Sequence, residues 1–382
     1  MNVLHLTSDW KFTGPAEPML IGGEALRARG HRVDLVCPPP PDGERGVFDV
    51  ARERGVDLEH SVAIERGRGI AALRDLRDVR AIRSWMVERE LDVVHVWPTR
   101  AHSLALRARG PSTALVRAHS DGLPVATGLR GAGTRWLYGA GCDALVCTSR
   151  NCMAQHADAV RAAKRHAVTG AVDLECFRPA RDVHEREAGR GRLGLRPKEP
   201  AVGVVARVQP QRRFDLVFEV LSELRHSHPA VHLVFLGRGT HIESVARRPV
   251  AELGLEANVV FAGHRTADYA EILRSLDALV FLVPGSDGGC RTVLEAAASG
   301  VPVVASRRGA LPELIGDGTT GYCVDEQARA LVPAIDLLLQ SEERRSEFGR
   351  DARAHAERWF SPGRLGEELE RVYESATEVR RR

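Results

Sequence analysis

The chain has 382 residues, more than a single hydrophobic core usually spans, so two domains of just under about 200 residues each are expected. Its content of 43% hydrophobic and 27% charged residues excludes an intrinsically disordered protein, and no apolar run approaches the roughly 18 residues of a membrane-spanning helix. Residues 1–170 hold 24 Lys and Arg against 19 Asp and Glu, an excess too small for nucleic-acid binding without a supporting motif.

The N-terminus and the cysteines bear on the cellular compartment. Residues 1–6 enter a strand pattern directly, without the basic start, apolar stretch and cleavage site of a signal peptide, so a cytoplasmic protein is expected. The seven cysteines form no CxxC pair, although Cys142, Cys147 and Cys152 follow one another at five-residue intervals. We interpret them as reduced, mostly buried thiols and expect neither a disulfide nor a metal site.

Short β-branched runs alternate with longer amphipathic stretches along the chain, which predicts parallel sheets with crossover helices. The predicted strands are residues 3–6, 32–37, 93–96, 114–117 and 144–148 in the first half, and 202–206, 231–236, 259–261, 278–282 and 302–306 in the second. A stretch rich in charges and turn formers separates a domain of residues 1–172 from a domain of residues 173–358. Residues 359–382 are expected to be a helical tail, because Pro362 fits the first turn of a new helix.

Residues 66–89 carry apolar side chains at helical spacing among seven arginines. One interpretation is a basic helix that touches a membrane surface or an acidic acceptor. The other is an ordinary crossover helix whose apolar stripe faces the sheet. Acidic residues in and beside the stretch dilute the positive charge, which favours the crossover helix.

The most informative stretch is residues 284–306, which follows an apolar strand, turns through glycines and opens a short helix that ends at Gly300. Glycines let the backbone approach a ligand, and the free N–H groups at a helix start favour an anion. Asp287 lies in the loop and Glu295 follows eight residues later within the helix. Both carboxylates can therefore face one ligand.

This stretch resembles the E-x7-E region of glycosyltransferase family 4, and the resemblance extends over nearly the whole chain. It implies the GT-B fold, in which two Rossmann-like, doubly wound α/β domains face a central cleft and the C-terminal helix returns to the N-terminal domain. Asp287 and the loop would contact the donor sugar, and Glu295 the ribose hydroxyls. The loop residues so assigned are Gly288, Gly289, Cys290 and Arg291. Asp287 stands where glutamate is usual, and a second interpretation is that it only caps the turn.

A second resemblance lies at residues 205–215, where the family has an arginine after a strand and a lysine five residues later. Arg207 matches the arginine, and Arg212 occupies the lysine position with a planar fork in place of a point charge. In the family both cations hold the donor diphosphate, where they stabilise the negative charge that develops on the leaving group. The alternative is a solvated surface cluster.

Three glycine or histidine positions match other family contacts with the donor. Gly14 matches the glycine whose amide meets the pyrophosphate, although its neighbour Pro15 has no N–H to give. Gly237 lies in the family's glycine turn beside the nucleotide, and His264 where these enzymes receive the base. Gly237 and His264 fit plain strand-to-helix turns equally well.

Two histidines follow strands of the first domain. His119 matches a family histidine near the donor sugar and the acceptor, where it would hydrogen-bond a hydroxyl or relay a proton. A structural role is the alternative for His119. His95, at the end of a neighbouring strand, is interpreted as a packing residue.

The resemblance implies a retaining glycosyltransferase that moves a sugar from a nucleotide-sugar donor to an acceptor hydroxyl, in the synthesis of a glycan, lipopolysaccharide or glycolipid. The acceptor would attack on the face that the diphosphate leaves, and the leaving phosphate would take the proton. Arg207, Arg212 and the helix start near Gly288 would supply the stabilisation that a metal ion gives elsewhere. Because no DxD motif and no His/Cys ligand spacing occurs, neither a metal nor a cofactor is expected.

Two alternatives remain open at this point. One is another reaction on the same fold, by a nucleotide-sugar epimerase, which needs no acceptor, or a glycoside phosphorylase, which uses free phosphate. The other is a non-catalytic nucleotide-sugar binding protein. The expected partners are the donor and a glycan, a lipid-linked or a small-molecule acceptor, with no nucleic acid. The basic N-terminal half also permits weak peripheral contact with the inner face of a membrane.

Overall fold

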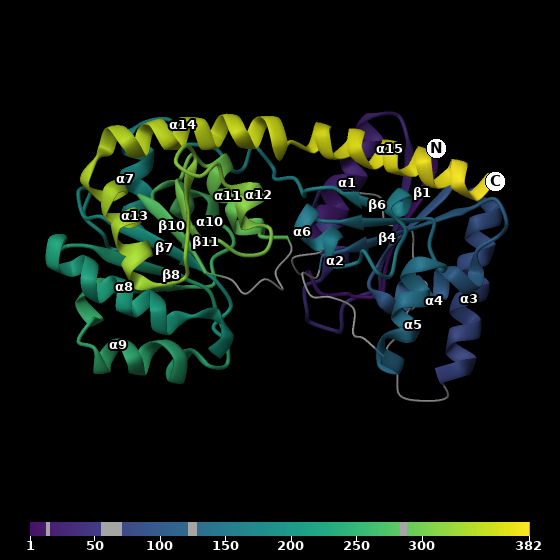
Figure 1. The fold of residues 1–382 in the computed structure, drawn as a ribbon, viewed down its shortest axis with the longest axis horizontal. Helices are drawn as coiled ribbons and strands as arrows, with labels where there is room; N and C mark the ends of the chain where they lie inside the picture. The colour runs from purple at the N-terminus through teal and green to yellow at the C-terminus, as the bar shows by residue number, and fades with distance from the viewer. Residues whose placement is uncertain (13–15, 55–70, 121–127, 283–288, 382) are drawn as a thin grey trace. The chain divides into compact units, whose positions relative to one another are not determined.

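The computed structural model describes residues 1–12, 16–54, 71–120, 128–282 and 289–381 (Figure 1). Its residues form two compact units, one of residues 1–171 with 362–382 and the other of residues 172–361. Each unit contains one six-stranded parallel sheet covered by helices on both faces. The predicted α/β class with two doubly wound domains is therefore confirmed, and each unit is described by itself below.

The sheet of the first unit has the strand order β2-β1-β3-β4-β5-β6. Its strands are β1 (Asn2–Thr7), β2 (Arg32–Val36), β3 (Val93–Trp97), β4 (Ala114–His119), β5 (Ala144–Cys147) and β6 (Arg165–Ala167). The chain leaves β1 for β2 on one side and returns to β3 on the other, so the strand order reverses between β1 and β3. Ligands of such sheets bind outside the carboxyl ends of the strands at the point of reversal.

Two helical layers cover this sheet. On one face α1 (Ala16–Ala28) packs beside the C-terminal helix α15 (Pro362–Arg381) (Figure 1). Tyr373 of α15 is fully buried and contacts His5 of β1 and His95 of β3. On the other face lie α3 (Ala71–Glu88) and α4 (Thr99–Ala108). The remaining helices are α2 (Val47–Glu53), α5 (Gly128–Gly139) and α6 (Arg150–Ala154). The predicted return of the C-terminal helix to the N-terminal unit is confirmed.

The packing of α3 distinguishes between the two interpretations of its apolar stripe, a membrane-contacting helix and a crossover helix. Val79, Ile82 and Met86 are buried in the core that α3 shares with α4. Arg83 donates hydrogen bonds to the carbonyl oxygens at the end of α4, and Asp75 pairs with Arg100 at 2.9 Å. The described part of α3 is thus a crossover helix with its apolar side on the sheet. Residues 66–70 lie outside the described residues.

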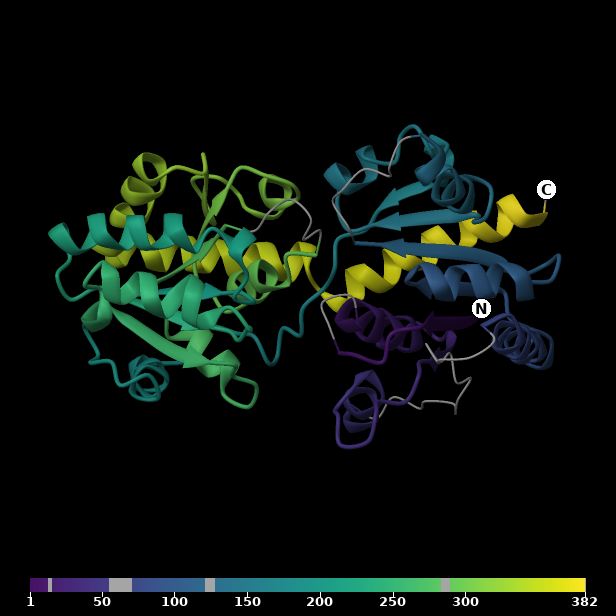
Figure 2. The same ribbon diagram turned by 90° about the horizontal axis from the view of Figure 1, so that it is seen from below.

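The sheet of the second unit has the order β12-β11-β10-β7-β8-β9, which reverses between β7 and β10. Its strands are β7 (Ala201–Val205), β8 (His232–Leu236), β9 (Val259–Gly263), β10 (Ala278–Phe281), β11 (Val303–Ser306) and β12 (Gly321–Val324). Its helices are α7 (Val183–Gly191), α8 (Phe214–Ser227), α9 (Arg248–Glu252), α10 (Tyr269–Arg274), α11 (Arg291–Ala298), α12 (Leu311–Leu314), α13 (Ala328–Gln340) and α14 (Glu342–Trp359). Figure 2 shows this layering from a second direction. Helices α10, α11 and α14 cover one face, and α8 and α13 cover the other.

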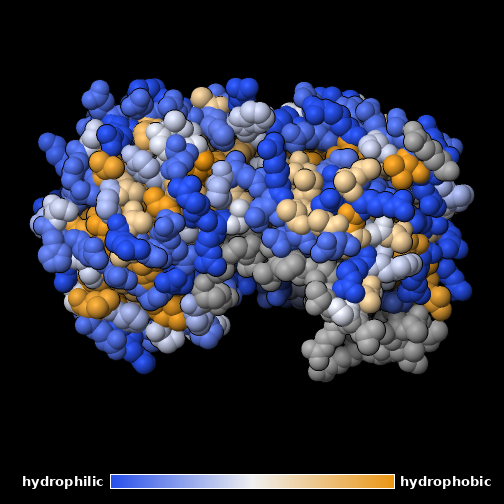
Figure 3. Space-filling model, viewed as in Figure 1, coloured by the Kyte–Doolittle hydropathy of each residue, from blue (hydrophilic) through white to orange (hydrophobic). Residues whose placement is uncertain are grey.

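The surface is mostly polar in the view of Figure 3, where apolar residues are scattered between charged ones. None of the helices within the described residues combines the length and the apolar character that crossing a membrane requires. Six of the seven cysteines are buried and Cys176 is exposed, as expected for packed thiols.

A buried ion pair anchors the second unit. The Asp277 carboxylate, 4% exposed, accepts hydrogen bonds from the Arg190 guanidinium at 2.7 Å and from the Ala201 N–H at 2.7 Å. Burial alone would raise the pKa of Asp277, but the charges of Arg190 and Arg186 and these hydrogen bonds hold it below its usual value. Asp277 therefore ties α7 to the amino ends of β7 and β10.

Replacing Asp277 by asparagine is expected to lower the free energy of unfolding by about 3–5 kcal/mol, because Arg190 keeps its charge in a buried position without a counter-ion. Urea denaturation followed by circular dichroism measures the change. Since the folded pKa lies below the unfolded value, the contribution is fully present above about pH 4 and is lost as the pH falls through the folded pKa. The matched control is Asp317→Asn, whose partner Arg307 is half exposed, with an expected loss under about 1 kcal/mol. Equal losses in the two variants would contradict the assignment.

Candidate functional site

Two cations follow β7 at the point where the second sheet reverses. Arg207 is exposed just after the strand, and Arg212 is half-buried at the end of a short helical turn, Pro210–Arg212. The next residue, Arg213, adopts the left-handed conformation with φ of 53° and forms ion pairs with Glu326 and Asp215. The turn thus places Arg207 and Arg212 at the carboxyl end of β7, while Arg213 is held by carboxylates.

Gly237 has a packing role that the sequence did not reveal. A Cβ atom at Gly237 would lie 2.0 Å from the carbonyl oxygen of Ala206, and one at Gly239 would lie 2.4 Å from that of Val208. The N–H groups of Ala206 and Val208 also donate hydrogen bonds to the carbonyl oxygens of Leu236, the last residue of β8, and of Arg238, which follows the strand. Both glycines therefore let the turn after β8 lie directly against the turn that carries Arg207.

His264 follows β9 in the neighbouring turn. It is exposed, and Gly263 before it adopts a positive φ of 71° while its carbonyl accepts a hydrogen bond from Gly237. Partial desolvation and the charge of Arg238 lower the pKa of His264. The imidazole is consequently neutral at physiological pH and can both donate and accept a hydrogen bond.

The loop after β10 enters α11 through a strained residue. Cys290 has φ of 37° and ψ of 40° at the N-cap, a conformation that residues other than glycine rarely adopt. Its side chain is buried in the core, so contact of Cys290 with a ligand has to come from its backbone. Gly289 is half-buried just before it. Strain of this kind is often found where a loop is shaped for binding.

Glu295 is the central carboxylate of α11. It is 2% exposed, accepts a hydrogen bond from the Tyr269 hydroxyl at 2.8 Å, and forms an ion pair with Arg291 one turn earlier. Burial and the charge of Glu295 raise the pKa of Tyr269 well above its usual value, so the phenol stays protonated as a donor. Tyr269 on α10 was not predicted from the sequence, because nothing in the local pattern links it to Glu295.

Three of the predicted site residues lie outside the described residues. These are Gly14, Asp287 and Gly288. The structure brings the predicted residues Gly289, Cys290, Arg291 and Glu295 together at the start of α11. Arg207 and Arg212 lie at the end of the adjacent strand, because β7 and β10 are hydrogen-bonded neighbours.

The first unit has a cavity of about 270 Å³ at the carboxyl ends of β1, β3 and β4. Thr7, Trp97 and His119, which end these three strands, line it together with Arg117 and with Tyr138 of α5. His119 is half-buried and meets the Tyr138 ring edge-on, with ring centroids 5.5 Å apart. The predicted residue His119 therefore lies in a cavity at the reversal point of its own sheet.

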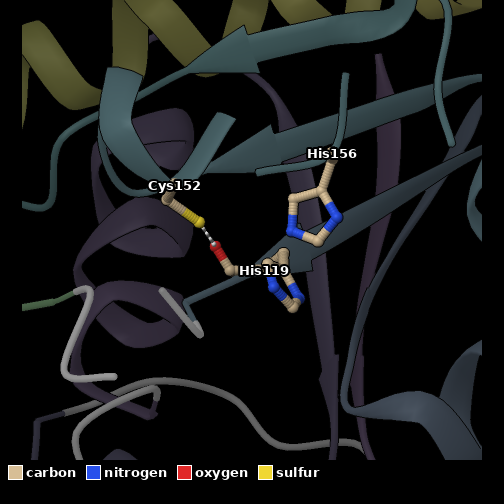
Figure 4. A group of neighbouring side chains, drawn as sticks. All are labelled: His119, Cys152 and His156. Atoms are coloured by element: carbon tan, nitrogen blue, oxygen red, sulfur yellow. Dashed lines mark hydrogen bonds between the residues drawn. The ribbon is translucent and has the colours of Figure 1, made fainter. Parts of the chain in front are cut away.

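His119 also belongs to a cluster with Cys152 and His156 (Figure 4). The possible ligand atoms of these three residues lie within 4.8 Å of one another, and the ring of His156 meets that of His119 edge-on, with centroids 4.3 Å apart. A hydrogen bond with Cys147, partly offset by burial, and the neighbouring His156 lower the pKa of the Cys152 thiol to about 6. Two imidazoles and a thiolate are ligands that suit Zn²⁺. The sequence spacing did not predict this cluster.

His95 has the structural role that was predicted for it. It is 1% exposed, and its Nδ1 atom lies 2.7 Å from the Tyr373 hydroxyl of α15. The same hydroxyl lies 3.0 Å from Nε2 of His5 on β1. Burial holds the pKa of His95 well below its usual value, so both histidines are neutral links between the sheet and α15.

Two family descriptions match successive parts of the chain. The family described as "Glycosyltransferase Family 4" matches residues 23–176, and "Glycosyl transferases group 1" matches residues 185–355. D-inositol 3-phosphate glycosyltransferase of Segniliparus rotundus is 34% identical over 51% of this chain and 44% of its own length. The match thus spans less than half of that relative. GDP-mannose-dependent alpha-(1-6)-phosphatidylinositol monomannoside mannosyltransferase of Mycolicibacterium smegmatis is 32% identical over 68% of this chain and 71% of its own length.

Solved structures show the same fold over nearly the whole chain. HepE of Anabaena, determined in complex with UDP and glucose, has a TM-score of 0.80 at 18% identity and covers 98% of this chain and 100% of its own. Sucrose-phosphate synthase of Thermosynechococcus elongatus has a TM-score of 0.72 at 19% identity, with 98% of each chain covered. Together with the long match to the mannosyltransferase, these findings establish that the chain belongs to glycosyltransferase family 4, the group 1 glycosyl transferases, and has the GT-B fold.

Proposed function

We propose that this protein is a retaining glycosyltransferase that moves a sugar from a nucleotide-sugar donor to an acceptor hydroxyl. The observation that carries the proposal lies in the second unit, where Arg207 and Arg212 follow β7 and the start of α11 follows β10. Two cations and a helix N-terminus at the reversal point of one parallel sheet form a favourable site for a diphosphate. Similarity to UDP-bound and GDP-mannose-dependent proteins supports a nucleoside-diphosphate sugar as the donor.

The proposed mechanism uses these groups to stabilise the leaving diphosphate. Negative charge grows on the bridging oxygen as the sugar departs, and fixed cations lower the energy of that state without moving. The acceptor hydroxyl attacks from the face that the diphosphate leaves, passes its proton to the leaving phosphate, and retains the anomeric configuration. Glu295 would hold the ribose hydroxyls in this arrangement, with Tyr269 and Arg291 fixing its carboxylate.

The first unit would hold the acceptor in the cavity beside His119. An imidazole in that position can donate a hydrogen bond to a hydroxyl of the donor sugar or the acceptor. The acceptor class that we propose is a glycan, a lipid-linked or a small polyol substrate. The named acceptors of two relatives, D-inositol 3-phosphate and a phosphatidylinositol monomannoside, are consistent with this class. Action in the cytoplasm, with peripheral contact at the inner face of a membrane, is part of the proposal.

The transfer is also proposed to need no metal ion and no cofactor, because Arg207 and Arg212 would supply the charge. We expect dialysis against EDTA to leave the rate of nucleoside-diphosphate release unchanged. Elemental analysis of the purified protein serves as the parallel measurement. Activity that EDTA removes and Zn²⁺ restores, but not in a Cys152→Ser variant, would instead assign a metal to the cluster of His119, Cys152 and His156. Restoration by Mg²⁺ or Mn²⁺ would place a metal at the diphosphate.

Product analysis tests the reaction itself. The protein is incubated with UDP-, GDP- and ADP-sugars and candidate polyol acceptors, and the anomeric proton of the product is followed by NMR. Transfer with retained configuration supports the proposal. A changed sugar without an acceptor would indicate an epimerase, dependence on free phosphate a phosphorylase, and binding without turnover a non-catalytic binding protein.

A further inference from the structure

The cavity of the first unit contains a buried cation that the proposed mechanism does not use. Arg117 is 5% exposed, lies two residues before His119 on the same side of β4, and lines the cavity. The Tyr138 ring packs against its guanidinium at 5.5 Å from the ring centroid. Among the described residues, the Nε and Nη1 atoms of Arg117 have no hydrogen-bond partner.

Within the described residues, no carboxylate is among the groups that act on the charge of Arg117. The groups that favour the charged form within the described residues are Tyr138, which also forms a side-chain hydrogen bond with the guanidinium, and Cys142, whose thiol is kept protonated by burial. Burial lowers the pKa of Arg117, because an environment with little water disfavours the charged form. A buried guanidinium whose N–H groups lack hydrogen-bond acceptors destabilises the folded protein. A bound anion removes this penalty, because it accepts those hydrogen bonds and balances the charge.

We propose that Arg117 binds an oxyanion of the acceptor, a phosphate or a carboxylate, within this cavity. The inference rests on the proposed function, because it names the chemical class of the acceptor. The cavity is close to the lower end of small-molecule sites, roughly 300–1,000 Å³, which fits a sugar- or polyol-sized acid or the head group of a lipid. Guanidinium groups recognise such oxyanions through charge-assisted hydrogen bonds.

The charges at the rim of the cavity bear on where the acidic group of the acceptor binds. Lys11 and Asp9 are both exposed there, and Asp9 accepts a hydrogen bond from the backbone N–H of Lys11. These two side chains cancel in formal charge, so Arg117 gives the described lining its net positive charge. The acidic group is therefore placed at the floor beside Arg117, which leaves the hydroxyls of the acceptor near His119.

Three sugars that share one ring test the proposal. Glucose, glucose 6-phosphate and glucuronate differ at C6 by a hydroxyl, a phosphate and a carboxylate. Calorimetric titration is expected to show that one of the two acids binds about tenfold to a hundredfold more tightly than glucose. Arg117→Met is expected to remove this preference, and Arg117→Lys to retain part of it. The preferred acid distinguishes a phosphate from a carboxylate ligand.

A second experiment tests oxyanion binding with a probe that has no sugar ring. Inorganic phosphate is compared with chloride at equal ionic strength in an Arg207→Ala/Arg212→Ala background, which disables the candidate diphosphate site. Phosphate should raise the melting temperature of this protein and fail to do so when Arg117→Met is added. Arg135→Met, which removes a half-buried cation from the same helix as Tyr138, is the matched control and should behave like its parent.

The inference is overturned if neither acid binds more tightly than glucose and phosphate gives the same shift with and without Arg117. It is also overturned if acid preference persists in Arg117→Met. Donor binding is measured on the same samples and should not change in that variant. Loss of donor binding in every protein with an intact diphosphate site, with Arg117-dependent acid binding retained, would defeat the proposed function but leave the oxyanion site at Arg117 in place.

Discussion

The double variant Arg207→Ala/Arg212→Ala is expected to lower kcat/KM by about 10³-fold or more while the protein keeps its stability. Each cation that faces developing charge contributes roughly 10²–10³ in rate. Arg207 is exposed and Arg212 is half-buried in a turn, and neither belongs to the hydrophobic core, so their removal leaves no cavity there. The loss should fall on both kcat and the donor KM, because the two cations hold the diphosphate in the ground state and also face the charge that grows on the bridging oxygen as the sugar leaves. Initial rates of nucleoside-diphosphate release at several donor concentrations measure both parameters.

Arg196→Ala is the matched control for that experiment. Arg196 is also exposed in the second unit, and its ion pair with Glu199 lies at the surface. It should leave kcat/KM within about twofold of the parent, because exposed ion pairs contribute little. If the double variant retained the activity of the Arg196→Ala protein, the two arginines would be a solvated surface cluster and the diphosphate assignment would be wrong.

The second large effect is expected at Glu295. Replacing it by glutamine keeps its shape but removes the charge, and we expect the KM for the donor to rise about tenfold to a hundredfold. Ribose contacts are made both before and during the reaction, so kcat should change less than KM. Glutamine also leaves Arg291 without its carboxylate partner, and a fall in melting temperature is therefore part of the expected result.

Tyr269→Phe separates the two roles of this pair. It removes the hydroxyl that donates to Glu295 but leaves the carboxylate and Arg291 in place. We expect a loss of about 1 kcal/mol in stability with a much smaller change in donor KM. If Glu295→Gln bound the donor as tightly as the parent, Glu295 would be a structural residue of α10 and α11 only.

The sheet strands were predictable because their apolar runs are nearly continuous. All ten predicted strands occur, with ends that differ by at most two residues. Among the described residues, the strands β6 and β12 were not predicted, because they lack that signal. β6 is three residues that are only half-buried, and β12 begins directly after a turn rich in glycine and threonine.

The candidate site was only partly predictable, because local sequence does not show contacts between distant segments. Arg207, Arg212 and Glu295 could be selected from spacing and family resemblance. Tyr269 lies 26 residues before Glu295, and its hydrogen bond depends on how α10 packs on α11. Arg117 was not predicted as a site residue, because a single arginine at the end of an apolar run indicates only that a strand ends there.

Gly237 illustrates a prediction whose physical reason differs from the expected one. The family resemblance assigns Gly237 to the turn beside the nucleotide. In the structure, the carbonyl oxygen of Ala206 leaves no room for a side chain at Gly237. Nucleotide binding and backbone packing both require glycine in this turn. Ligand-binding measurements distinguish the two roles, because the close approach of the Ala206 backbone alone accounts for glycine at this position.

The most direct test of the central claim is a melting-temperature screen of the full chain against UDP-, GDP- and ADP-sugars. We predict that one donor, together with its free nucleoside diphosphate, raises the melting temperature by several degrees, as expected for a ligand present at about 100 times its Kd. The shift should disappear in Glu295→Gln and in Arg207→Ala/Arg212→Ala and persist in Arg196→Ala. A folded protein that responds to none of these donors, or whose response ignores these substitutions, would contradict the account.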